Sequence, residues 1–426
     1  MSEASNGGVS SSSGRMFSIT TFGESHGPGI GVVIDGCPAG IAIDSDFIQR
    51  QLTRRRPGQN RLTTPRNEED RFQILSGVYE GRTLGTPIAL FVPSTDVKSG
   101  DYYRWADVYR PSHADFTYHA KYGYRTPIGG GRASVRETIG RVAAGALAAQ
   151  ILREEFGTEV IAWVDSIGKT TGLGYEHPPT SIDEVDASIV RSHLPDVSER
   201  MIQEIEQARL AGDSVGGTIC VIVRNVPPGL GEPVFDKLEA EVAKACLSIP
   251  ACKGFESGSG FAGTTMRGSE HNDAFFVKGK DAASTEGEDD GSDTDRENME
   301  RVRPGYVPHP VHGVENVPEL YTKTNRSGGI QGGISNGMPL LFRLAFKPTA
   351  TVRKRQVTSN ESGEPITLRA GGRHDPCVVP RAVPIVESAI HLVLMDMMLR
   401  QRAIHPEWWL RYSKNAKNYL SKITES

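Results

Sequence analysis

The 426-residue sequence predicts a mixed α/β (α+β) protein. Two observations predict this class. Short apolar runs broken by glycines are typical of strands, and longer segments carry apolar residues at helical spacing. A hydrophobic share of 37% is adequate for a buried core, and the length suits one large or two ordinary domains. These patterns do not define a strand order.

The same patterns place the individual elements along the chain. Residues 17–43 alternate apolar runs with glycines, which indicates two strands joined by a glycine loop over 23–29. Further strands are expected at 87–92, 217–226 and 338–346. Helices are expected at 136–156, 198–210, 235–247 and 384–401.

One expected helix follows the motif GGGRASVRET, and its apolar spacing predicts an amphipathic helix. Ser134 followed three residues later by Glu137 fits a capping box, so we expect this helix to begin near Ser134. The free backbone N–H groups of a helix start favour an anion, and Arg132 and Arg136 stand beside them. The alternative is a tight glycine connection with both arginines in solvent.

Composition excludes several classes of protein. A net charge of −4 and a pI near 6.3 argue against a nucleic-acid binder. No run approaches the roughly 18 apolar residues of a membrane span, and the N-terminus lacks a secretion signal. We therefore expect a cytosolic protein, with import into an organelle as the alternative because the start is serine-rich. Five cysteines without a CxxC pair suggest neither a zinc site nor a disulfide framework.

Two segments are expected to be disordered. Residues 1–15 form a serine-rich tail. Residues 280–300 form an acidic insertion that carries almost no apolar side chains, so burial cannot offset the entropy lost on ordering. A loop that binds a partner through its acidic residues is the alternative for the insertion.

The densest cationic run is TRRRPGQNRLTTPRNEEDR, which has six arginines and no lysine. It includes Arg54, Arg55 and Arg61. Arginine is preferred where carboxylate or phosphate is held by two parallel hydrogen bonds, so the run predicts a surface for a small, multiply charged anion. Nucleic acid is a weaker candidate because no aromatic residues for base stacking are interleaved. A solvated loop paired to its own acidic residues is the remaining alternative.

Three histidines lie in glycine- or proline-rich motifs: His26 in FGESHGPG, His113 in RPSHADFTY and His374 in GGRHDPC. Histidine exchanges protons near neutral pH, and Asp375 adds a carboxylate beside His374. Neither HxxxH nor HExxH occurs, so we expect no metal. Each histidine alone could instead serve as a hydrogen-bonding group in a turn. A glycine loop also leads into the expected strand at 338–346, whose end could meet a cofactor phosphate or form an ordinary hairpin.

Six motifs together closely resemble the chorismate synthase family. They are FGESHG at 22–27, RRRPGQ at 54–59, RPSHADFTYHAKYG at 110–123, GGGRASVRETIGRVAAGA at 129–146, GGISNGMP at 332–339 and GGRHDPCVVPRAVP at 371–384. The resemblance implies a βαβ sandwich core with helices and long active-site loops. It also implies one catalytic domain over 16–402, a C-terminal extension over 403–426, and usually a homotetramer.

The resemblance further implies a lyase of the shikimate pathway. Such an enzyme converts 5-enolpyruvylshikimate 3-phosphate to chorismate by 1,4-elimination of phosphate, with reduced FMN required but not consumed. Some members reduce their FMN with NADPH, and others need an outside reductant. The rivals are an NADPH-dependent flavin reductase and a noncatalytic phosphate- or flavin-binding module, which have no reason to assemble the same acids and bases.

The resemblance also implies roles for individual residues. His26 is the acid near the leaving phosphate, His113 protonates the reduced flavin, and Asp375 takes part in proton removal. Positions that match FMN ligands are Arg132, Ala133, Ser134, Gly332, Lys347, Pro348, Thr349, Ala350, Thr351 and Arg373. The arginines expected to bind substrate or NADPH are Arg54, Arg55, Arg61 and Arg136.

Overall fold

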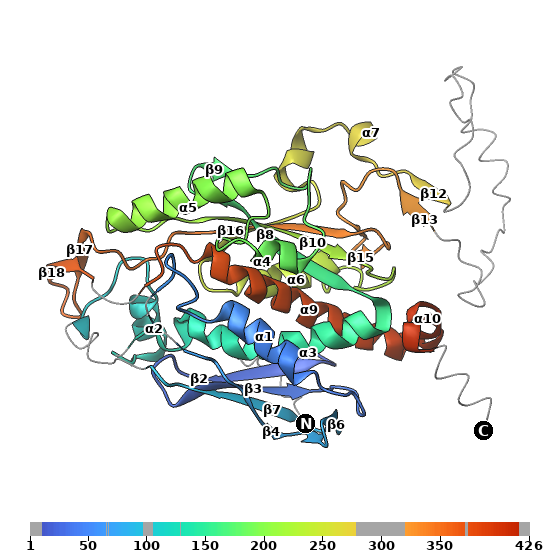
Figure 1. Ribbon diagram of the computed structural model, residues 1–426, viewed down its shortest axis with the longest axis horizontal. Coiled ribbons are helices and arrows are strands. Elements are labelled where there is room, and N and C mark those ends of the chain that lie inside the picture. Colours follow the sequence, from blue (N-terminus) through green and yellow to red (C-terminus); the bar gives the residue numbers. More distant parts are fainter. Residues whose placement is uncertain are drawn as a thin grey trace, which may run out of the picture.

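The computed structural model describes residues 11–64, 66, 68–96, 105–127, 129–277, 320–370 and 374–416. Two five-stranded antiparallel sheets enclose a layer of helices between them (Figure 1). The apolar residues from both sheets and from the helices form one large core. This is the βαβ sandwich that the sequence motifs predict.

The first sheet contains the strands expected from alternating apolar residues. Its order is β1 (Ser12–Ser13), β2 (Ser18–Gly23), β3 (Gly29–Asp35), β7 (Ile88–Pro93) and β4 (Gln73–Ser76). In β7, Ile88, Leu90 and Val92 are buried toward the helices, whereas the residues between them are half-buried. This period of two is that of a strand with one face in the core.

The second sheet has the order β11 (Cys252–Ser257), β16 (Leu340–Phe346), β10 (Gly217–Arg224), β8 (Glu159–Ile167) and β9 (Thr170–Thr171). Strands β10 and β16 lie where the sequence predicts them. The strand β8 was not expected. Its eight residues after Glu159 are buried on both faces, so it shows no alternation by which to recognise it.

Four helices fill the layer between the sheets: α1 (Ser45–Arg55), α3 (Thr138–Phe156), α6 (Leu238–Leu247) and α9 (Val379–Ile404). Helices α3 and α9 pack closely because Gly145 of α3 faces Ser388 of α9, where an added Cβ would lie 2.6 Å from the serine Cβ. The expectation that α3 is amphipathic is wrong. Neighbours cover it on nearly all sides, and its apolar residues face both sheets.

The start of α3 also differs from the expected capping box. Two short 3₁₀ turns, η3 (Gly131–Ala133) and η4 (Val135–Glu137), precede the helix, which begins at Thr138. The Ser134 hydroxyl accepts a hydrogen bond from the backbone N–H of Arg136 at 3.3 Å, so the serine does cap a turn. The Glu137 carboxylate instead pairs with Arg141 at 2.9 Å.

The remaining elements connect or cover these layers. The helices are α2 (Asp115–Tyr122), α4 (Ile182–Asp186), α5 (Pro195–Leu210), η5 (Gly260–Thr265), α7 (Gly268–His271) and α10 (Pro406–Tyr412). The short strands are β5 (Val78–Tyr79), β6 (Arg82–Thr83), β12 (Phe275–Val277), β13 (Leu320–Thr322), β14 (Ile330–Gln331), β15 (Ile334–Ser335), β17 (Arg355–Ser359) and β18 (Pro365–Arg369).

The two ends of the chain are partly built into the fold. Residues 11–15 of the expected tail include β1, which pairs with β2, and residues 1–10 lie outside the described residues. The acidic insertion at 280–300 also lies outside them. The expected boundary at 402 falls within α9, and Trp408 of α10 is buried against Phe156 with 5.6 Å between ring centroids.

Helix α9 is long and apolar enough to cross a membrane, but 89% of its most apolar window is buried inside the protein. Its neighbours are α3, α6 and β8. A core helix of a globular protein has the same composition, because protein rather than lipid surrounds it. This burial accounts for the apolar character of α9.

Candidate active site

A cavity of about 200 Å³ lies where several predicted motifs meet. Segments far apart in the sequence line it: the loop after β2, the end of α1, the loop before α2, the turns before α3, the loop after β16 and the start of α9. The polar side chains among its lining residues belong to Ser25, His26, Arg55, Thr64, Arg66, Arg110, His113, Ser134, Arg136, Thr349, Thr351, His374, Asp375 and Arg381.

The three expected acid–base residues converge in this cavity. His26 is oriented through its Nδ1 atom, which lies 3.1 Å from the Ser25 hydroxyl. The Asp375 carboxylate accepts a hydrogen bond from the backbone N–H of Thr64 at 2.9 Å and pairs with Arg381. Both contacts fix the carboxylate at the cavity wall.

His113 is oriented by a third set of contacts. Its Nδ1 atom lies 3.3 Å from Asp115 Oδ1 and 3.1 Å from Arg110 Nη2. Arg110 also binds Asp115 directly at 2.7 Å. Burial alone would raise the pKa of the Asp115 carboxyl, but the hydrogen bonds and electrostatic attraction of Arg110 and His113 outweigh it and hold this pKa far below its usual range. An ionised Asp115 therefore fixes the His113 ring with Nε2 pointing away from it.

The position of His26 depends on Gly129. This glycine has φ +73°, and a Cβ added to it would lie 2.1 Å from His26 Nδ1. The imidazole thus occupies the space that any other residue at position 129 would fill. The glycines before α3 therefore place a side chain of the site as well as turning the chain.

We expect Gly129→Ala to abolish most of the activity while the protein stays folded, because the new methyl group displaces the His26 ring. Gly81→Ala is the matched control, since Gly81 has φ +74° and no atom within 4 Å of its added Cβ. Both variants should lose about 1–2 kcal/mol of stability from the left-handed backbone. Thermal unfolding and turnover separate the two effects. Equal turnover in the two variants would contradict the role of Gly129.

Two buried arginines of the cavity share one carboxylate. Asp70 pairs with Arg55 through Oδ2 and with Arg136 through Oδ1, the latter at 3.3 Å. Arg55 Nε and Nη1 and Arg136 Nε are buried without a hydrogen-bond partner. Burial lowers the pKa of Arg55 to about 10, with the positive charges of Arg381 and Arg136 acting in the same direction. Such a site favours an anion that can accept these hydrogen bonds.

The charge of the cavity supports the same conclusion. Among its described lining residues are five arginines, Arg55, Arg66, Arg110, Arg136 and Arg381, and a single carboxylate, Asp375. Arg66 and Arg136 are held from behind by Glu68, at 2.7 Å and 3.5 Å. The arrangement suits a small molecule with several negative charges.

His374 adds a neutral imidazole. Burial lowers its pKa to about 4, and the positive charge of Arg110 lowers it further. Its Nε2 atom is buried without a hydrogen-bond partner, and so is Oγ1 of Thr349, another residue that lines the cavity. These two atoms, like the free nitrogens of the arginines, fit a polar ligand.

The low pKa of His374 predicts a pH dependence of stability. Between pH 6.5 and pH 4 the unfolded chain binds a proton at this histidine that the folded chain does not bind. The free energy of unfolding should therefore fall as the pH drops through this window. His374→Gln should flatten that part of the curve, measured by chemical unfolding at several pH values. An unchanged slope in the variant would contradict the prediction.

Some of the residues expected to bind flavin line the cavity in the structure, and others lie elsewhere. Ala133, Ser134 and Thr349 to Thr351 line the cavity, and Pro348 directly precedes them. Lys347 lies at the end of β16, where its amine donates to the Ser112 carbonyl at 2.9 Å.

Two further flavin positions are placed elsewhere. The Arg132 guanidinium donates to the backbone carbonyls of Gly23 at 3.0 Å and Thr21 at 3.1 Å, so it anchors β2. Gly332 lies in the turn between β14 and β15, which Figure 1 places at the opposite end of the molecule from β17 and β18. Arg373 lies outside the described residues.

Two of the four arginines expected to bind substrate or NADPH lie outside the cavity. Arg54 is buried in an ion cluster with Glu387 at 2.5 Å and Asp186 at 2.6 Å. Arg61 is 62% exposed and pairs with Glu206 at 3.0 Å. The structure therefore assigns Arg54 to the core and Arg61 to the surface of this chain, and leaves Arg55 and Arg136 at the cavity.

Sequence reasoning did not assign site roles to Ser25, Arg110 and Arg381. Each lies inside a predicted motif: Ser25 beside His26, Arg110 at the start of RPSHADFTY, and Arg381 six residues after Asp375. An arginine close in sequence to an expected acid or base is the signal that could have identified the last two.

A cationic cavity that gathers three acid–base side chains within an α/β sandwich is typical of an enzyme that acts on a small polyanion. Comparisons with known proteins agree. The model of the chorismate synthase family matches residues 17–399. Chorismate synthase of Leptospira biflexa serovar Patoc is 50% identical over 404 residues, which cover 95% of this chain and 97% of that protein. Chorismate synthase of Synechococcus elongatus is 52% identical over 401 residues, covering 94% and 100%.

A solved crystal structure of chorismate synthase superposes with a TM-score of 0.66 and 28% identity, covering 97% of this chain and all of the other. The chain therefore belongs to the chorismate synthase family. It is a carbon–oxygen lyase of the shikimate pathway, which leads to the aromatic amino acids.

Proposed function

We propose that this chain converts 5-enolpyruvylshikimate 3-phosphate to chorismate by 1,4-elimination of phosphate, in the cavity around His26, His113 and Asp375. One observation carries the proposal: three oriented acid–base groups and several unpartnered N–H donors of arginines line the same cavity. The substrate has two carboxylates and a phosphate. Five arginines against one carboxylate suit that charge.

The elimination needs one proton acceptor and one proton donor. A ring C–H bond breaks, its electron pair forms a new double bond, and the C–O electron pair leaves with the phosphate, so there is no net redox change. Asp375, oriented by Thr64 and Arg381, takes part in collecting the ring proton. His26, oriented by Ser25, gives a proton to the departing phosphate.

The residues along one wall of the cavity fit a flavin phosphate or ring edge. Ala133 and Ser134 present backbone and hydroxyl groups, and the buried Oγ1 of Thr349 has no partner. Reduced FMN, when bound there, supplies electron density that helps the C–O bond to break. His113 presents its Nε2 atom to that side of the cavity, since Asp115 and Arg110 occupy its Nδ1.

The test is anaerobic turnover of 5-enolpyruvylshikimate 3-phosphate by the full chain with FMN, following chorismate with dithionite and, separately, with NADPH. Chorismate with dithionite supports the proposed reaction. Chorismate with NADPH alone shows in addition that the chain reduces its own flavin. Folded, FMN-binding protein that gives no chorismate with either reductant would refute the proposal.

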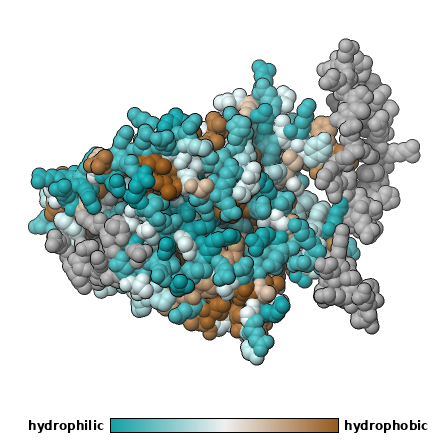
Figure 2. Space-filling view, in the orientation of Figure 1, coloured by the Kyte–Doolittle hydropathy of each residue, from teal (hydrophilic) through white to brown (hydrophobic). Residues whose placement is uncertain are grey.

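We also propose that the chain assembles as a homotetramer. Phe22 and Leu75 in the first sheet, and Tyr79 and Leu84 in the adjoining β5–β6 hairpin, are exposed apolar side chains, and Figure 2 shows a brown patch over this part of the molecule. Such patches mark protein–protein contacts. Light scattering should give four times the chain mass of 46.2 kDa. Leu75→Lys should lower the assembled mass, and a monomeric unaltered protein would contradict the proposal.

A further inference from the structure

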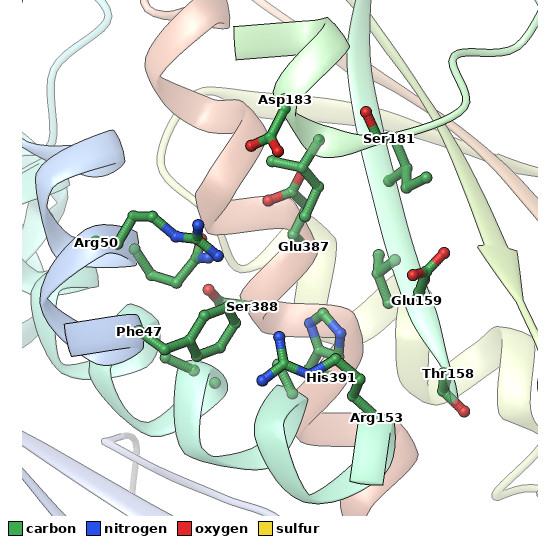
Figure 3. Close-up of a pocket in the computed structure, with 17 residues that line it drawn as sticks. Phe47, Arg50, Arg153, Thr158, Glu159, Ser181, Asp183, Glu387, Ser388 and His391 are labelled. Atoms are coloured by element: carbon green, nitrogen blue, oxygen red, sulfur yellow. The ribbon is translucent and has the colours of Figure 1, made fainter. Parts of the chain in front are cut away.

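A second cavity, of about 170 Å³, lies between α1, α3, α4, α9 and the start of β8 (Figure 3). It shares no lining residue with the candidate active site. Its floor is apolar and close-packed, formed by Ala146, Ala149, Val160 and Ile161. A dry protein cavity of about 150 Å³ holds a benzene ring, so this floor has room for one ring or a branched aliphatic group.

Two arginines on one side of this cavity pack against the same aromatic ring. The guanidinium carbons of Arg50 and Arg153 lie 5.4 Å and 4.8 Å from the centre of the Phe47 ring. Neither arginine forms an ion pair within the part of the chain that the structure describes. Phe47 thus holds two guanidiniums at the cavity edge, where their N–H groups can bind a carboxylate.

Carboxylates also line the cavity. They belong to Glu159, Asp183 and Glu387, and in the view of Figure 3 those of Asp183 and Glu387 lie above the Arg50 guanidinium. Glu387 is engaged by Arg54 at 2.5 Å and by the backbone N–H of Ala162 at 3.3 Å. Asp183 forms no ion pair with Arg50 or with any other residue that the structure describes. Its carboxylate is therefore available to an ammonium group.

These charges select the kind of ligand. A purely anionic ligand meets the carboxylates of Glu159, Asp183 and Glu387, and a purely cationic ligand meets Arg50 and Arg153, so either is repelled at one side. His391 at the floor adds no further charge, because burial lowers its pKa to about 4. A ligand with a positive group, a neighbouring negative group and an apolar body can contact the carboxylates, the arginines and the apolar floor at the same time.

We propose that this cavity binds a free α-amino acid with an apolar side chain. Its ammonium group lies at Asp183, its carboxylate at Arg50, and its side chain between Phe47 and the floor formed by Ala146 and Val160. The site is separate from the elimination reaction, although α1 and α9 contribute to both cavities.

The test is calorimetric titration of the full chain with L-phenylalanine. D-Phenylalanine, phenethylamine and 3-phenylpropionate serve as probes with the wrong hand or with one charge missing. We expect L-phenylalanine to bind and each of the other three to bind at least about tenfold more weakly. Phenethylamine and 3-phenylpropionate each lack one charged contact, and the D isomer cannot place its ammonium, carboxylate and side chain in all three positions at once. No binding of L-phenylalanine, or equal binding of a singly charged probe, would overturn the proposal.

Variants locate the binding. Arg50→Gln and Asp183→Asn should each weaken it at least about tenfold. Arg200→Gln, at an exposed arginine of α5, should leave it unchanged. Because Arg50 is exposed at the cavity rim, Arg50→Gln should keep its thermal stability and its rate of chorismate formation, so this result is independent of the proposed reaction. Unweakened binding in Arg50→Gln would assign the amino acid to another site and refute the inference.

Discussion

Asp375→Asn should lower kcat by about 10²–10⁴-fold and leave KM almost unchanged. The amide has the shape of the carboxylate, and its oxygen still accepts the hydrogen bond from Thr64, which is 2.9 Å long in the unaltered protein. It cannot accept the ring proton. Of the five arginines that line the cavity only Arg381 pairs with Asp375, so we expect the charge that attracts an anionic substrate to remain while proton removal fails.

The measurement is steady-state turnover with reduced FMN under anaerobic conditions, together with thermal unfolding. Asp196→Asn, at an exposed aspartate in the first turn of α5, is the matched control and should behave like the unaltered protein. A kcat for Asp375→Asn within a few-fold of the control value would remove Asp375 from proton transfer. A rise in KM without a fall in kcat would assign it to substrate binding.

The strand β7 was predictable because one of its faces is only half-buried. Ile88, Leu90 and Val92 alternate with half-buried neighbours, and this alternation identifies β7. The strand β8 and the full burial of α3 escaped prediction for the same physical reason. An element covered on both sides has no polar face, so its sequence carries no period that tells a strand from a helix.

The residues of the candidate site were predictable where a short, distinctive motif contains them. His26, His113 and Asp375 lie in short glycine- or proline-rich motifs, and the structure brings all three to one cavity. The arginine run was less informative, because neighbouring residues on a helix point about 100° apart. Arg54 and Arg55 are adjacent on α1, yet one faces Glu387 in the core and the other faces the cavity. The presence of several arginines in a run does not tell which of their side chains face the cavity.

The largest effect on stability is expected from Asp70→Asn. Asp70 is fully buried between the guanidiniums of Arg55 and Arg136. Removing its charge leaves Arg55 without a counterion and leaves Arg136 only its longer contact with Glu68 at 3.5 Å. Breaking a buried ion pair from one side costs about 3–5 kcal/mol. Asp70 has φ +50°, a conformation that asparagine tolerates well, so the substitution changes the charge with little backbone strain.

Glu69→Gln is the control within the same segment, because Glu69 and Arg71 form a pair in which both side chains are more than 70% exposed. That variant should lose less than about 1 kcal/mol. Chemical unfolding of both variants, with and without inorganic phosphate at constant ionic strength, gives the free energies. Phosphate should stabilise Asp70→Asn more than the unaltered protein, since an anion bound only by the folded state replaces the missing counterion. Equal, small losses in the two variants would mean that Asp70 does not hold the two arginines of the cavity.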